Sequence, residues 1–375
     1  MPSPPPDFEL TKEEIVMKDP IGLTKTTVVQ ETEEVIIEKQ EGVRARIINY
    51  WKDAIRKYNL HFFFIGLQLS VFAFFQILNG KELIFSFDWF ALIIILLIVV
   101  GSFIVYVLKL YPYASPVDIM IEMTPFFFAY YSYSLIAALT KNVIYPNVHL
   151  YFPYKLEKAL FGWMIGNQTP NYWLENLVKS PAMDIISALI YTFDMSVPIL
   201  LCVYYFLSRR RESFELATLS ILLMGLMAQV TFVLLPTSPP WYVREFGFTA
   251  PWYGRDYSPY SGAGLSTFDE LTGFPLISMF YSGSSDYFAA FPSMHAGFGF
   301  ISLLIAYHGL GKKSLIFTIP FNLIVYIIAI YTFHHYIIDL IAGMVYATVA
   351  YFLVKKLMKI FKREEILTGF GFKYT

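Results

Sequence analysis

Two short polar stretches beside apolar runs hold the residues that are best placed to do chemistry. Ser293 and His295 lie where one apolar run begins. Farther along, His335 and Asp339 are four residues apart, a spacing that puts two side chains on one face of a helix. The neighbouring His334 has no carboxylate at this spacing. Because ionisable groups at membrane-depth segments are usually functional, these residues form our candidate catalytic site.

The residue types in these stretches predict phosphoryl transfer. Pro292 suits the start of a helix and Ser293 its cap, and the free N–H groups at that end attract an anion such as phosphate. His335, held by Asp339, is expected to act as a nucleophile. His295, opposed to it, is expected to protonate the departing oxygen. The sequence therefore predicts a phosphohistidine intermediate and no metal or other cofactor.

Two other interpretations stay open. Two histidines and one aspartate can ligate zinc, although the helix-start motif around Ser293 and the lack of further ligands favour a metal-free site. Alternatively, the protein is a non-enzymatic membrane transporter or scaffold that keeps the helical core, in which case His335→Ala leaves its function intact.

The composition predicts an all-α membrane protein that crosses the bilayer several times. Of the 375 residues 56% are hydrophobic and only 15% are charged, too few for the surface of a soluble protein of this length. The net charge of −1 gives no reason to expect a nucleic-acid partner. Cys202 is the only cysteine, so a disulfide framework or a cysteine-based metal site is excluded.

Apolar runs of about 20 residues predict the membrane spans. We expect about eight of them, near residues 60–79, 89–110, 119–140, 182–207, 214–235, 293–309, 314–333 and 336–354. The aromatic segment 141–180 is expected to lie at the interface, and the long loop 236–292 to form a lid or a binding loop.

The same patterns suggest a division of the chain. We expect a disordered cytoplasmic tail over 1–45, N-terminal spans over 46–140, a phosphatase-like or phosphotransferase-like core over 141–355 and a second cytoplasmic tail over 356–375. Lysine and arginine are concentrated in alternate short connections, which predicts cytoplasmic termini. The candidate site then lies on the non-cytoplasmic face, and the cell membrane is the expected location.

The motifs resemble those of a known superfamily. Pro292-Ser293-Met294-His295 and His335-xxx-Asp339 are similar to motifs of the type 2 phosphatidic acid phosphatase and haloperoxidase superfamily. Further stretches resemble the branch that contains the inositol phosphorylceramide synthases: 156–162, 184–198, 235–241 and 334–340.

This resemblance covers about residues 150–355 and implies a phosphatase-type helical core. It also implies His335 as nucleophile, Asp339 as its orienting partner, His295 as general acid and Ser293 as a phosphate contact. The implied substrate is a membrane lipid phosphate or phosphodiester. With water as acceptor the protein would be a lipid phosphatase, and with inositol or another alcohol a headgroup phosphotransferase.

The chain departs from the superfamily pattern in ways that affect substrate binding. The arginine that the superfamily places before the nucleophile is Ala329 here, which leaves Arg244 and Arg255 as the expected counter-charges of the phosphate. Asp184 and Asp194, in the fourth expected span, are candidate substrate-binding residues. For Asp184 simple helix capping remains an alternative, and for Asp194 a structural bond inside the bundle.

Overall fold

The computed structural model describes residues 42–53, 58–78, 100, 104, 107, 116–125, 128, 148–248, 262–281 and 288–367. The chain divides into two compact units, residues 1–59 and 60–375. In the first unit, residues 42–53 are helical. In the second, the described residues form helices joined by turns, with isolated bridges of Thr237 to His149 and to Ala289. The prediction of an all-α fold is confirmed.

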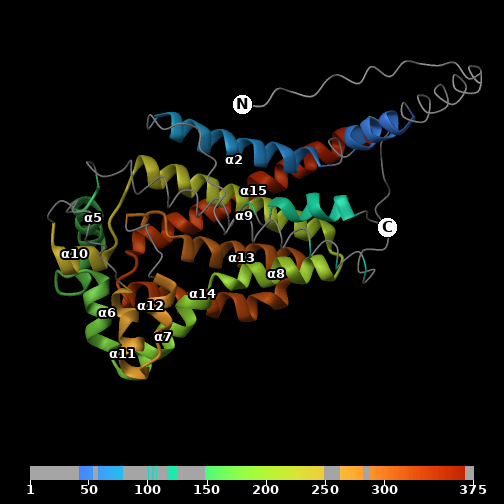
Figure 1. Cartoon of the computed structure of the whole chain (residues 1–375). Coiled ribbons are helices and arrows are strands. Elements are labelled where there is room, and N and C mark those ends of the chain that lie inside the picture. The colour runs from blue at the N-terminus through green and yellow to red at the C-terminus, as the bar shows by residue number, and fades with distance from the viewer. Residues whose placement is uncertain are drawn as a thin grey trace, which may run out of the picture. The chain divides into compact units, whose positions relative to one another are not determined.

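Helix α13 (Met294–Leu310) lies at the centre of the second unit (Figure 1). It packs against α15 (Ile337–Leu367), α14 (Leu315–Tyr331), α9 (Arg211–Leu234) and α8 (Ser196–Leu207). Apolar side chains of α8, α9, α13 and α15 form the main core, together with residues of α2 (Asn59–Leu78). Because α13 carries His295, this packing fixes that histidine relative to the helices around it.

Several of these helices are long and apolar enough to cross a membrane. They are Arg211–Leu234, Lys312–Tyr331 and Ile337–Phe361, together with the pair α7 (Pro181–Phe193) and α8 if the two count as one broken span. Asn59–Val71 and α13 are shorter apolar helices. The expected spans near 89–110 and 119–140 fall largely outside the described residues, so the count of eight remains a prediction.

The span expected over 182–207 is not a single straight helix. It breaks between α7 and α8, which are inclined to each other by 43°. Pro198 explains the break, because a proline ring has no N–H and collides with the carbonyl four residues earlier, here that of Asp194. That carbonyl instead accepts a bond from Val197 N at 3.1 Å. Asp194 therefore lies at a kink rather than inside a regular helix.

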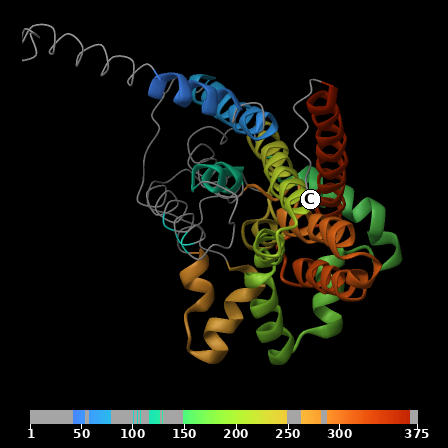
Figure 2. The same cartoon turned by 90° about the vertical axis from the view of Figure 1, so that its right-hand side faces the viewer.

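Short helices gather at one end of the bundle (Figure 1), and Figure 2 views the molecule from the opposite end. They are α5 (Tyr151–Phe161), α6 (Pro170–Val178), α10 (Pro240–Phe246), α11 (Thr267–Thr272) and α12 (Leu276–Tyr281). None is long enough to span a bilayer. The interfacial position of segment 141–180, which contains α5 and α6, stays a prediction. At the other terminus, α15 continues beyond residue 355, so the start of the expected tail is helical.

Candidate functional site

The cap of α13 connects the two predicted motifs. The Ser293 hydroxyl accepts a hydrogen bond from Ala296 N at 3.3 Å, as the sequence predicts for a helix cap. Ser293 N donates to the carbonyl of Asp339 in α15 at 3.0 Å. Ser293 is fully buried, and its hydroxyl is occupied by the bond from Ala296 N that caps α13.

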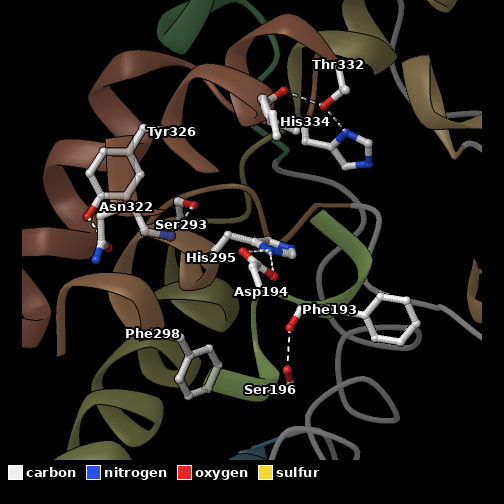
Figure 3. A network of polar contacts seen from close by, with 12 residues as sticks. Phe193, Asp194, Ser196, Ser293, His295, Phe298, Asn322, Tyr326, Thr332 and His334 are labelled. Atoms are coloured by element: carbon white, nitrogen blue, oxygen red, sulfur yellow. Dashed lines mark hydrogen bonds and ion pairs between the residues drawn. The ribbon is translucent and has the colours of Figure 1, made fainter. Parts of the chain in front are cut away.

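His295 is held by the carboxylate at the kink between α7 and α8. Its Nδ1 lies 3.0 and 2.9 Å from the two carboxylate oxygens of Asp194 (Figure 3). The Tyr191 ring stacks on the imidazole, with ring centres 3.9 Å apart. Because Nδ1 donates to Asp194, the second ring nitrogen, Nε2, is left for another partner. Asp194 is thus a partner of His295, which the sequence did not indicate.

His335 has a different partner, the backbone carbonyl of Ala290, which lies 3.0 Å from its Nδ1. A carbonyl can only accept, so Nδ1 carries the proton and neutral His335 has its lone pair on Nε2. Burial lowers the pKa of His335, and Asp339 opposes this shift. These conditions favour the neutral imidazole, the form that can act as a nucleophile.

Asp339 lies next to His335, as the spacing predicts, but at a longer distance than a hydrogen bond. Its Oδ2 is 3.7 Å from Nδ1 of His335 and accepts a bond from Tyr336 N at 2.8 Å. The carboxylate is completely buried in the first turn of α15. Asp339 therefore caps α15 while staying within ion-pair distance of the imidazole.

The two imidazoles lie close together because α13 and α15 approach closely. Their ring centres are 5.9 Å apart and the ring planes are inclined by 56°. Gly343 allows this approach, since a Cβ atom added there would lie 2.1 Å from the carbonyl oxygen of Ser293. The structure thus brings together the two histidines that the sequence separates by 40 residues.

The turn that carries His335 is anchored from several directions. Asn171 donates to the carbonyls of Ile330 and His335 at 2.8 and 3.0 Å. Trp241 N donates to Phe333 O, and Gly264 N donates to Thr332 O. Phe333 has a φ of 61°, an uncommon value for a residue with a side chain. These bonds fix the turn despite this strained residue.

Glu157 of α5 is a further residue of the site that the sequence did not single out. Its carboxylate accepts bonds from Ile337 N at 2.8 Å and Ile338 N at 3.3 Å, at the start of α15. Burial raises its pKa to about 7, against the opposing effect of these two bonds, and the charge of Asp339 raises it further. Glu157 lies within the stretch 156–162 that resembles the synthase branch, which was the one available signal.

His334 is turned toward a different set of groups. Its Nδ1 lies 2.9 Å from the Thr332 hydroxyl and its Nε2 lies 3.1 Å from the Tyr281 hydroxyl of α12. Burial lowers its pKa. His334 thus ties the loop helix α12 to the turn before His335, consistent with the prediction that His335 is the histidine with the carboxylate neighbour.

The other predicted substrate-binding residues lie elsewhere around this end. Asp184 accepts a hydrogen bond from the Tyr331 hydroxyl. Arg244 pairs with Glu175 at 3.2 Å, and its guanidinium lies 4.4 Å from the ring centre of Phe333. Arg255 lies outside the described residues. Of these residues, Arg244 is the cation beside the turn that carries His335.

Metal ligation was the competing interpretation of the same side chains. Across the described residues, histidine, cysteine, aspartate and glutamate side chains nowhere gather in groups of three or more that could hold a metal ion. The two aspartates of the site lie beside different histidines, Asp194 at His295 and Asp339 at His335.

Comparison with known proteins identifies the family. A sequence profile described as the PAP2 superfamily matches residues 167–353. The phosphoinositol dihydroceramide synthase of Bacteroides thetaiotaomicron is 32% identical over 221 residues, which are 55% of this chain and 68% of that protein. The chain belongs to the PAP2 superfamily.

Two yeast proteins match a shorter part of the chain. The catalytic subunit of inositol phosphorylceramide synthase is 31% identical in Schizosaccharomyces pombe and 33% in Saccharomyces cerevisiae, over 36% and 34% of this chain. Each match spans 30% of the yeast protein. No solved structure matches the chain significantly.

Proposed function

We propose that this protein is a membrane lipid headgroup phosphotransferase that works through a phosphohistidine at His335. The observation that carries the proposal is the pair of opposed imidazoles, one bonded to a carbonyl and the other to a carboxylate. The names of the relatives point to phosphoinositol as the transferred group and to a ceramide-type alcohol as the acceptor. Transfer to water, which would make the protein a lipid phosphatase, is the competing outcome.

The proposed reaction has two steps. In the first, Nε2 of His335 attacks the phosphorus of a lipid phosphodiester, and the bond to the departing lipid alkoxide breaks as His295 protonates it. In the second, the acceptor hydroxyl gives its proton to His295 and attacks the phosphorus, and the bond to His335 breaks. The imidazolium of His295 and the positive end of the helix dipole at the start of α13 would offset the negative charge of the phosphoryl group. Arg244 is the candidate for an additional cation.

Trapping the intermediate tests the nucleophile. Purified protein would be mixed with a lipid phosphodiester labelled in its phosphate and quenched in alkali, which preserves phosphohistidine. Wild type and His308→Ala, a matched change near the far end of α13, should retain label on the chain, and His335→Ala should not. Label on His335→Ala would refute the proposed nucleophile, and an unimpaired cellular function of this variant would favour a transporter or scaffold.

Acceptors and chelators separate the remaining alternatives. Addition of a ceramide should divert the label into a new lipid, whereas release of the labelled headgroup phosphate at an unchanged rate would indicate transfer to water, the hydrolytic outcome. Activity should persist in EDTA. Loss of activity on chelation, restored by zinc, would contradict the metal-free mechanism.

A further inference from the structure

We propose that Asp194 is a positioning residue that holds His295 in the orientation from which its Nε2–H protonates the departing lipid alkoxide. This inference rests on the proposed function and assigns a role to a residue for which the sequence suggested only substrate binding or helix packing. The Asp194 side chain is 3% exposed, and both of its oxygens lie within 3.0 Å of Nδ1 of His295. Among the residues that the structure describes, no other side chain bonds this carboxylate.

The kink between α7 and α8 brings the carboxylate to this position. Pro198 prevents the regular helical bond to the carbonyl of Asp194, and the two helices diverge by 43° at this point. The Ser196 hydroxyl bonds the carbonyl of Phe193 at 2.5 Å and so satisfies a backbone group that the break would leave free (Figure 3). Asp194 therefore bonds His295, 101 residues away in sequence, from the interruption in the span.

The partners of the two histidines suit the two side chains to different roles. The carboxylate of Asp194 accepts from Nδ1 of His295, which orients the ring and places a negative charge beside the histidine that is to donate the proton. The carbonyl partner of His335 carries no charge, and burial lowers the pKa of that imidazole. The histidine on the carboxylate is therefore suited to donate a proton and the histidine on the carbonyl to act as the nucleophile.

The remaining groups around His295 are compatible with a positive charge. The Tyr191 ring stacks on the imidazole at 3.9 Å, and the face of an aromatic ring attracts a cation. His335 lies at 5.9 Å and is neutral in this state. The charge on His295 is thus balanced by Asp194, with Tyr191 packed over the ring.

The proton from His295 matters most when the leaving group is a strong base. A lipid alkoxide leaves slowly unless Nε2–H of His295 protonates it as its bond to phosphorus breaks and the bond from His335 forms. His295 is then neutral and still donates to Asp194 through Nδ1. A p-nitrophenolate leaves without a proton, so its departure should be nearly independent of Asp194.

The experiment compares two donors that share the phosphoinositol group, one with diacylglycerol and one with p-nitrophenol as leaving group. Single-turnover phosphorylation of His335 would be measured for wild type, Asp194→Asn and Asp194→Glu. Asp194→Asn should slow the diacylglycerol donor by roughly 100-fold and the p-nitrophenyl donor by less than about 5-fold, with KM little changed. Asp194→Glu, which keeps the charge, should restore part of the lost rate with the diacylglycerol donor.

The control is Asp184→Asn, a change at a buried aspartate of α7, the helix that Asp194 follows; Asp184 bonds Tyr331 rather than a histidine. It should change both rates by the same factor. Equal losses with both donors in Asp194→Asn would overturn the inference, because a purely structural defect cannot distinguish leaving groups. If wild type phosphorylates His335 with neither donor, the proposed function itself fails.

Discussion

Gly343 offers the most direct test of how the fold positions the site. A Cβ atom at this residue of α15 would lie 2.1 Å from the carbonyl oxygen of Ser293 and 3.0 Å from Gly297 N. Both contacts are with the backbone of α13, so no side chain can rotate away. An ordinary contact distance is about 3.5 Å, so Gly343→Ala must move the two helices apart locally by more than about 1 Å.

The expected cost has two parts. Overpacking of a core typically destabilises a protein by about 1–3 kcal/mol. The separation also stretches the bond from Ser293 N to Asp339 O, now 3.0 Å, which connects the starts of the two helices. Since a misplacement of about 1 Å can cost about 100-fold in rate, we expect kcat to fall by roughly that factor.

Thermal unfolding and phosphotransfer of the purified protein would measure both effects. Gly225→Ala is the matched control, because Gly225 lies inside α9 and a Cβ atom there would meet nothing within 4 Å. Alanine has the higher helix propensity by about 1 kcal/mol, so the control should be as stable as wild type or more stable. A Gly343→Ala variant with unchanged unfolding temperature and kcat would refute the close-packing argument.

Three further predictions concern the buried carboxyl group of Glu157, the Pro198 kink and the membrane topology. The pKa of Glu157 is raised to about 7 in the folded protein, so stability should fall by about 3 kcal/mol as the pH rises from below 4.5 to above 7. Glu157→Gln should abolish this dependence in thermal unfolding at a series of pH values, and a flat wild-type profile would contradict it. Pro198→Ala should straighten the kink and lower kcat while the unfolding temperature holds or rises; unchanged kcat would show that the kink does not position the acid. A cysteine at exposed Glu270, with the buried Cys202 as the chain's own thiol, should react with an impermeant reagent only from outside the cell, and labelling only from the cytoplasm would reverse the topology.

The convergence of the two histidines could be predicted from the sequence. Two apolar runs and a short basic turn separate His295 from His335, which allows one crossing out and one back. The four-residue spacing also identified Asp339 as the neighbour of His335. The spacing implies that both residues lie in one helix, and this was only partly right. Helix α15 begins at Ile337, so Asp339 is in the helix but His335 lies in the preceding turn. The ring is oriented instead by the bond that its Nδ1 donates to the carbonyl of Ala290.

The partners of the site could not be found in this way. Asp194, Glu157 and Asn171 lie between 101 and 181 residues away in sequence from the groups that they bond. No local periodicity reports such a contact. The Pro198 kink could be expected from the sequence, but not that the kink would direct a carboxylate toward His295, since this depends on how α7 and α8 pack beside α13.

Irregular backbone is the common feature of both histidine environments. An unbroken helix through 182–207 would place Asp194 in a regular turn, and an unbroken helix through 314–354 would leave no turn for His335. Such breaks are costly near a bilayer unless the freed backbone groups find partners. Here Asn171, Trp241 and Gly264 supply them for the second break. Since these bonds surround the histidine turn on several sides, we infer that the breaks persist because they position the reacting groups.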